Sequence, residues 1–154
     1  AACVGPSAGP HPSLPQKVVV LPIKLLDTSA EPLDQRADHA RRLATLTSDL
    51  AIDLGKTDLF RTVEVQPEVL RQRCPDEAAD CLLNVARDEG ARLVFFGVVH
   101  KSSTLILQMW ARLVDAETRS VVFSRELSFR GDTDEAWRRA EAFLVEQVRS
   151  APPR

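Results

Sequence analysis

The segment from residue 92 to residue 130 constrains the fold more than any other part of the chain. It begins with RLVFFGVVH (92–100), a continuous apolar run of strand length that is typical of a strand buried on both faces. Residues 104–113 then alternate. One face of this second strand carries Leu105, Leu107, Met109, Ala111 and Leu113, and the other carries Thr104, Ile106, Gln108, Trp110 and Arg112.

A third apolar run, VVFSRELSF (121–129), follows the polar turn DAETRS (115–120). Its alternation predicts one face with Val121, Phe123, Leu127 and Phe129, and an opposite face with Val122, Ser124, Glu126 and Ser128. Three strands joined by short connections predict an antiparallel meander. Gly97, inside the first of these strands, indicates the close approach of a neighbouring element.

The chain before residue 92 alternates between strands and helices. KVVVLPI (17–23) has the character of a buried strand that Pro22 ends or bends, and KLLDTSAEP (24–32) leads out of it as a loop. An apolar stripe predicts a long helix over residues 34–54. The further predicted elements are a strand at 61–65, a short helix from residue 67, a helix at 79–90 and a closing helix at 131–150, which Asp132 and Glu135 cap.

The predicted order is β-α-β-α-α-β-β-β-α, with helical crossovers that imply parallel pairing among the first three strands. We therefore predict an α/β fold of the two-layer α+β type. It has one five-stranded mixed sheet and helices mainly on one face. The predicted domain spans residues 17–150. A flexible tail rich in Pro and Gly precedes it at residues 1–16, and a short C-terminal tail follows at 151–154.

Cys74 and Cys81 enclose six residues in the segment CPDEAADC. A zinc site would need a second pair of ligands besides these two cysteines. A redox-catalytic motif would need two residues between the cysteines rather than six. A continuous helix would hold the two Cα atoms about 10 Å apart, so a disulfide requires a break, which Pro75 supplies. We predict a disulfide between Cys74 and Cys81 in an oxidising compartment. The alternative is a pair of reduced thiols in a cytosolic protein.

The start of the chain, AACVGPSAGPHPSLPQ, has the small residues expected after removal of a signal peptide. The alternative is a chain cut at a domain boundary. Ala1-Ala2-Cys3 matches the end of a bacterial lipobox, which makes Cys3 a candidate lipidation site. No run approaches the roughly 20 apolar residues that span a bilayer. The expectation is a periplasmic protein without a membrane span, with a lipid tether to the outer membrane through Cys3 as an open alternative.

Several segments, in their order along the chain, resemble one family of envelope domains. They are VVVLPI, LFRTVEV, EGARLVFFG and RLVDAETRSVVFS, within about residues 17–148. The chain resembles the N-terminal domain of TolB and CsgG-like envelope proteins, including secreted single-domain relatives of unassigned role. Arg119 replaces the glycine that is usual in the turn, and the chain has no room for pore-forming hairpins. The resemblance implies an adaptor or assembly domain, with no catalytic residues or cofactor to transfer.

The residues themselves indicate no chemical reaction. No phosphate-binding loop, nucleophile elbow or metal-ligand spacing is present, so we expect no catalytic, cofactor-binding or metal-binding residues and no cofactor. A net charge of −2 gives no reason to expect nucleic acid as a partner. His39 and His100 are expected at the surface or at an element boundary, and Asp132 is expected to compensate the dipole of a helix start.

Ile106, Trp110 and Val122 are predicted to lie together on the side of the meander that faces away from the core, with Gln108 and Arg112 at the rim. We therefore expect a non-enzymatic protein-binding adaptor, an accessory subunit of an envelope assembly whose partner is another envelope protein. The N-terminal tail or a helix covering this face is one alternative. A sensor domain that holds a small ligand beside the C-terminal ends of the parallel strands is a second, and an enzyme of unrecognised type is a third.

Overall fold

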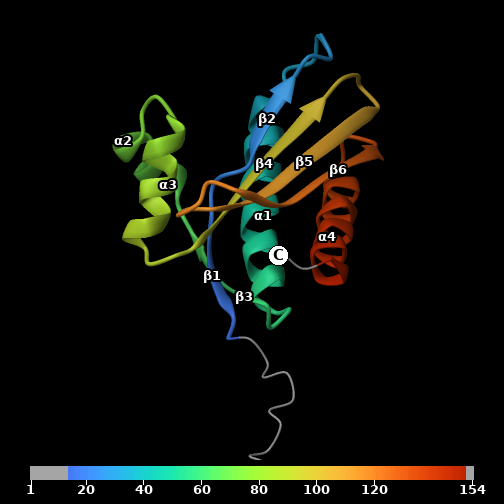
Figure 1. Ribbon diagram of the computed structural model, residues 1–154. Helices are drawn as coiled ribbons and strands as arrows, with labels where there is room; N and C mark the ends of the chain where they lie inside the picture. The colour runs from blue at the N-terminus through green and yellow to red at the C-terminus, as the bar shows by residue number, and fades with distance from the viewer. Residues whose placement is uncertain (1–13, 152–154) are drawn as a thin grey trace, which may run out of the picture.

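A mixed sheet forms the centre of the structure, a computed structural model that describes residues 14–151 (Figure 1). Five of its strands follow the order β3-β1-β4-β5-β6, and β2 pairs with β4. The strands are β1 (Gln16–Val20), β2 (Lys24–Asp27), β3 (Phe60–Glu64), β4 (Leu93–Lys101), β5 (Ile106–Asp115) and β6 (Val121–Arg130). Pairing is parallel among β1, β3 and β4 and antiparallel from β4 to β6, which confirms the predicted mixed sheet.

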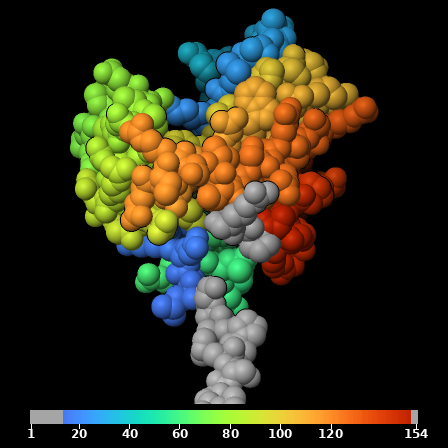
Figure 2. All heavy atoms as spheres, viewed as in Figure 1, coloured from blue at the N-terminus to red at the C-terminus, as the bar shows by residue number. Residues whose placement is uncertain are grey.

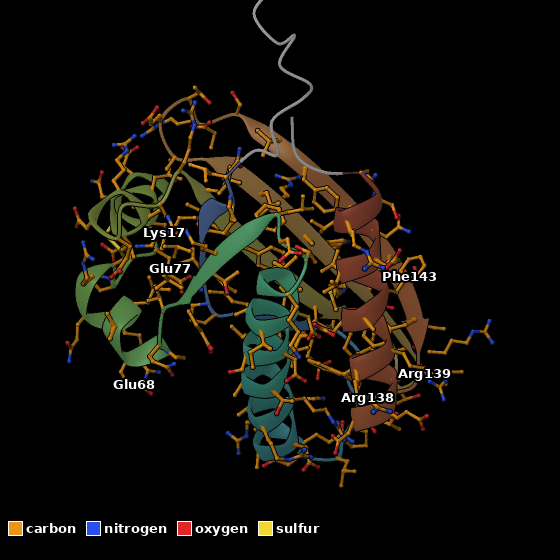
Figure 3. The ribbon with its side chains drawn as sticks, turned by 90° about the horizontal axis from the view of Figure 1, so that it is seen from below. Lys17, Glu68, Glu77, Arg138, Arg139 and Phe143 are labelled. Atoms are coloured by element: carbon orange, nitrogen blue, oxygen red, sulfur yellow. A yellow bond between two sulfur atoms is a disulfide. The ribbon has the colours of Figure 1, made fainter. Side chains whose placement is uncertain are left out.

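Four helices pack on the sheet, as predicted: α1 (Arg36–Gly55), α2 (Pro67–Arg73), α3 (Ala79–Asp88) and α4 (Asp134–Ser150). The two long helices, α1 and α4, lie side by side over one face and enclose the larger apolar core (Figure 3). The shorter α2 and α3 contribute to a second core, on the opposite face of β1 and β4 (Figure 1). Most helical cover is therefore on one face, and α3 leaves only part of the other face open.

The segment Lys24–Asp27, predicted as part of a loop, is instead the strand β2. The reason lies in the lengths of the strands. β1 pairs only with the first part of β4, up to Phe95, so the last part of β4 would keep unpaired backbone groups. The chain bends after β1, and β2 then pairs with Val98 to Lys101. A Cβ on Gly97 would lie 3.1 Å from Ile23 Cγ1, which confirms the close approach predicted at this glycine.

A β-bulge in β6 overturns part of the predicted alternation. Leu113 pairs with Phe123 and Val114 pairs with Val121, so Val122 is the extra residue. Val122 packs against the larger core, and Val121 is 51% exposed. The predicted facing of these two valines is therefore wrong. Beyond the bulge, Phe123 belongs to the larger core, and Leu127 and Phe129 pack against it, as predicted.

The predicted disulfide joins Cys74 to Cys81, with the two Cα atoms 5.8 Å apart. It forms because α2 ends at Arg73 and α3 begins at Ala79, which supplies the expected break. Cys74 is buried in the second core, so the disulfide ties the start of α3 to the buried end of α2.

Two expectations concern residues that the structure does not describe. Cys3, the candidate lipidation site, and the course of the N-terminal tail both lie outside residues 14–151. Within that range, none of the helices combines the length and apolar character that crossing a bilayer requires.

Candidate protein-docking site

A groove of about 580 Å³ lies on the outer face of the sheet, between α3 and the strands β4 and β5. Figure 2 shows the surface hollowed between the yellow-green lobe of α2 and α3 and the gold and orange strands. We call it the docking groove. Its lining consists of Ala79, Leu83, Phe96, Gly97, Val98, Trp110, Arg112, Val114 and Arg119.

Trp110 is the largest side chain of the docking groove. It is 36% exposed, and its cross-strand neighbours are Val98 on β4 and Glu126 on β6. The ring of His100 packs beside it, with 5.4 Å between the ring centroids. Trp110 therefore presents an aromatic surface to solvent on the face opposite the larger core, where sequence analysis placed it.

The other predicted contact residues divide into three groups. Arg112 is exposed and lines the docking groove beside Trp110. Ile106 and Gln108 lie half-buried on the same face, nearer the start of β5, and do not line the groove. Val122 is wrong as a member of this face, because the bulge turns it toward the larger core.

The α3 wall of the docking groove, formed by Ala79 and Leu83, was not predicted from the sequence. The handedness of the crossovers explains its position. β3 lies on one side of β1 and β4 on the other, so right-handed β1-α1-β3 and β3-α3-β4 connections must put α1 and α3 on opposite faces. The amphipathic pattern of residues 79–90 was visible in the sequence. The face that this helix covers depends on the strand order, which was not.

The turn between β5 and β6 closes one end of the docking groove. Asp115 Oδ1 accepts hydrogen bonds from the backbone N–H groups of Glu117 (2.8 Å) and Thr118 (3.0 Å), and the bond from Thr118 contributes most to lowering the pKa of Asp115. Arg119 has a left-handed backbone with φ of 64°. Its guanidinium forms an ion pair with Asp80 of α3, so the turn contacts the wall of the groove.

A second cleft, also of about 580 Å³, lies at the carboxyl ends of the parallel strands β1 and β3. It lies between α1, the break between β1 and β2, and the start of α2. Ser48 donates a hydrogen bond of 3.0 Å to Glu64 on its wall, and Lys24 and Glu77 form an ion pair at its lining. This is the position at which open α/β sheets bind small ligands, because neighbouring crossovers leave the sheet on opposite faces there.

The end of β4 holds a buried polar cluster that sequence analysis did not predict. Lys101 is 1% exposed, and its ammonium group donates hydrogen bonds to Glu31, to Gln35 Oε1 (2.7 Å) and to Asp132 Oδ2 (2.8 Å). His39 is also buried, with Nε2 2.6 Å from Asp132 Oδ2. The expectation that His39 lies at the surface or an element boundary is therefore wrong.

Asp132 is the acceptor at the centre of this cluster rather than a helix cap. Burial on its own raises the pKa of Asp132, but hydrogen bonds from Lys101, His39 and Trp137 outweigh burial and lower it to about 2. Thr133 caps α4 instead, because its hydroxyl accepts the Ala136 N–H at 3.1 Å. The cluster therefore connects α1, β4 and the start of α4 by charge-assisted hydrogen bonds.

A second buried acid, Glu141, lies between α4 and α1 and is 3% exposed. Burial is the main cause that raises its pKa to about 8, and a hydrogen bond with Asp53 and the negative charges of Asp53 and Asp49 add to the effect. Its Oε1 atom has no hydrogen-bond partner. Glu141 therefore holds its proton more tightly than an exposed glutamate does. Across residues 14–151, no group of three or more His, Cys, Asp and Glu side chains has the geometry to hold a metal ion.

A protein-family model described as a protein of unknown function (DUF2380) matches residues 16–148 of this chain. Comparison with curated proteins finds no match. Among solved structures, the PelC dodecamer from Paraburkholderia phytofirmans is 18% identical to this chain, with a TM-score of 0.57. The match covers 96% of this chain and 95% of the PelC chain.

Two further structures share the fold. Lipoprotein GNA1162 from Neisseria meningitidis is 16% identical to this chain, with a TM-score of 0.55. The match covers 88% of this chain and 99% of the GNA1162 chain. TolB from Acinetobacter baumannii is 12% identical and has a TM-score of 0.52; the match covers 91% of this chain and 29% of TolB. These matches support the TolB part of the resemblance, and the envelope class of domain, as a likeness of fold. They give no support to the CsgG-like label.

Proposed function

We propose a protein-docking function for this chain, which belongs to the family described as a protein of unknown function (DUF2380). The proposed molecule is a non-enzymatic adaptor of the periplasm that binds another envelope protein through the docking groove. The observation that carries the proposal is Trp110, a partly exposed aromatic side chain in a groove whose other walls are mainly apolar. Tryptophan is enriched among the residues that contribute most to protein–protein binding, and exposed apolar patches mark interaction sites.

Two other observations support the envelope part of the proposal. The disulfide between Cys74 and Cys81 is of the kind that persists in oxidising compartments. Lipoprotein GNA1162 has the same fold over nearly its whole length. A lipid tether through Cys3 and the removal of a signal peptide remain predictions of the sequence.

The proposal is tested by substituting Trp110 with Asp, which puts a charge into the apolar groove. Affinity purification from the native envelope with wild-type bait identifies the partner, and the same purification is repeated with Trp110→Asp and with Phe143→Asp. Phe143 is the matched control because it is 54% exposed and lies on the outer side of α4 (Figure 3). We expect Trp110→Asp to lose the partner and Phe143→Asp to keep it. A folded Trp110→Asp protein that retains the partner would show that the docking groove is not the binding surface.

A second candidate function is a sensor that binds a small molecule, and the cleft at the carboxyl ends of β1 and β3 favours it. Its volume of about 580 Å³ is within the range of pockets that hold drug-sized ligands. Native mass spectrometry of protein purified from its own envelope distinguishes the two functions. A retained small molecule that is displaced by Ala44→Trp, at an exposed residue of the cleft lining, would favour the sensor.

A further inference from the structure

The charge of the docking groove is unbalanced. Its lining is apolar except for Arg112 and Arg119, and it includes no acidic side chain. Arg119 is compensated by its ion pair with Asp80. Arg112 forms no ion pair with any residue in the part of the chain that the structure describes. Arg112 is therefore a cation without a bonded counter-charge at the wall of an apolar groove.

The position of Arg112 relative to Trp110 is set by the strand. The two residues are separated by one position on β5, so they project from the same face, about 7 Å apart along the strand. The cross-strand neighbours of Arg112 are Phe96 on β4 and Ser124 on β6, and neither carries a charge. Glu126, opposite Trp110, is diagonal to Arg112 but does not reach ion-pair distance.

A partner that fills the groove removes water from Arg112. Desolvating a guanidinium without a counter-charge is costly, whereas a carboxylate can accept two parallel N–H bonds from it. The same cation repels a partner segment that brings a Lys or Arg to this point. The groove therefore selects both for an apolar anchor at Trp110 and for an acid beside that anchor.

We propose that the occupant of the docking groove is a short apolar segment of a partner protein that carries a carboxylate next to its anchoring side chain, with Arg112 as the residue that recognises the carboxylate. This inference rests on the proposed function, and it adds the chemistry of the partner. The groove volume of about 580 Å³ suits a few side chains of one segment rather than a broad flat surface.

The test is selection from a library of random peptides displayed on phage, carried out against the wild-type domain and, as the subtraction, against Trp110→Ala, which removes the aromatic anchor without adding a charge. We expect the Trp110-dependent peptides to be enriched in Asp or Glu beside a large apolar residue. Arg112→Gln should weaken an acidic peptide about tenfold or more, because it removes a charge-assisted hydrogen bond. Arg112→Glu should reverse the preference toward peptides that contain Lys or Arg.

Arg139→Glu is the matched control, since Arg139 is an exposed arginine on the outer side of α4 (Figure 3). It should leave the preference for acidic peptides unchanged, and circular dichroism should show that every variant is folded. Trp110-dependent peptides without acid enrichment would overturn the inference and leave the docking function standing. A selection without any Trp110-dependent peptide would overturn both. Self-association that Trp110→Asp abolishes, measured by analytical ultracentrifugation, would replace the acidic partner with a second copy of the chain.

Discussion

Glu141 should make the stability of this protein fall as the pH rises, and Glu141→Gln should remove most of that dependence. Burial between α1 and α4, next to Asp53, raises the pKa of Glu141 from an ordinary value of 4.5 to about 8. The folded protein therefore holds a proton that the unfolded chain releases between these two pH values. Because the folded state binds more protons in this window, the free energy of unfolding decreases as the pH rises from about 4.5 to about 8.

The size of the effect follows from the same two pKa values. Each unit of difference between the pKa values of the unfolded chain (4.5) and the folded protein (about 8) corresponds to about 1.4 kcal/mol. The loss in the free energy of unfolding is therefore at most roughly 5 kcal/mol. About 3 kcal/mol of it is already lost at pH 7. Glutamine keeps the shape of the protonated acid and donates to Asp53 at every pH. We expect the Glu141→Gln and wild-type proteins to be about equally stable near pH 4.5 and to diverge steadily above it.

The assay is urea unfolding followed by circular dichroism at intervals from pH 4.5 to pH 9, for wild type and Glu141→Gln. Glu146→Gln is the control, because Glu146 is an exposed acid of the same helix that pairs with Arg149. The difference between wild type and Glu141→Gln should grow with pH, whereas the Glu146→Gln difference should stay flat. Parallel stability curves for wild type and Glu141→Gln would mean that Glu141 is already ionised in the folded protein, which refutes the assignment.

Three other perturbations have calculable outcomes. Lys101→Met should destabilise the fold by about 3–5 kcal/mol in urea titrations, because it leaves the buried carboxylate of Asp132 without its ammonium donor; an unchanged midpoint would contradict the role of the cluster. Arg119→Gly should raise the free energy of unfolding by about 1 kcal/mol, because glycine adopts the left-handed backbone without strain, and Arg119→Ala should not. Reduction of the disulfide between Cys74 and Cys81 should lower the free energy of unfolding by roughly 2.5 kcal/mol, and a count of two reactive thiols from these residues before reduction would contradict the bond.

The local sequence pattern was sufficient to predict the strands in which buried residues recur at regular positions. The continuous apolar run of β4 and the alternation along β5 predicted both strands and the face on which Trp110 lies. Regularity also explains the errors. Strict alternation assigned Val122 to the wrong face because the β-bulge adds one residue to β6. The bulge contains no glycine that would have marked its position in the sequence. Leu105, predicted to face the core, instead precedes β5 and is 51% exposed.

Features that depend on distant parts of the chain could not be predicted in this way. Asp132 and His39 are 93 residues apart in sequence, and nothing local distinguishes either from a surface residue. The position of the α3 wall of the docking groove likewise depends on the strand order, in which β3 and β4 pair with opposite edges of β1. The disulfide was predictable because both partners and the break between them fall within one short segment.

The disulfide has a consequence for the wall of the docking groove. Cys81 belongs to α3 and lies between Ala79 and Leu83, the two side chains that wall the docking groove. The disulfide therefore restrains the helix that supplies one wall of the docking groove. In a copy with free thiols the start of α3 would lack this covalent restraint, so we expect Ala79 and Leu83 to be held in place less firmly before the chain reaches an oxidising environment.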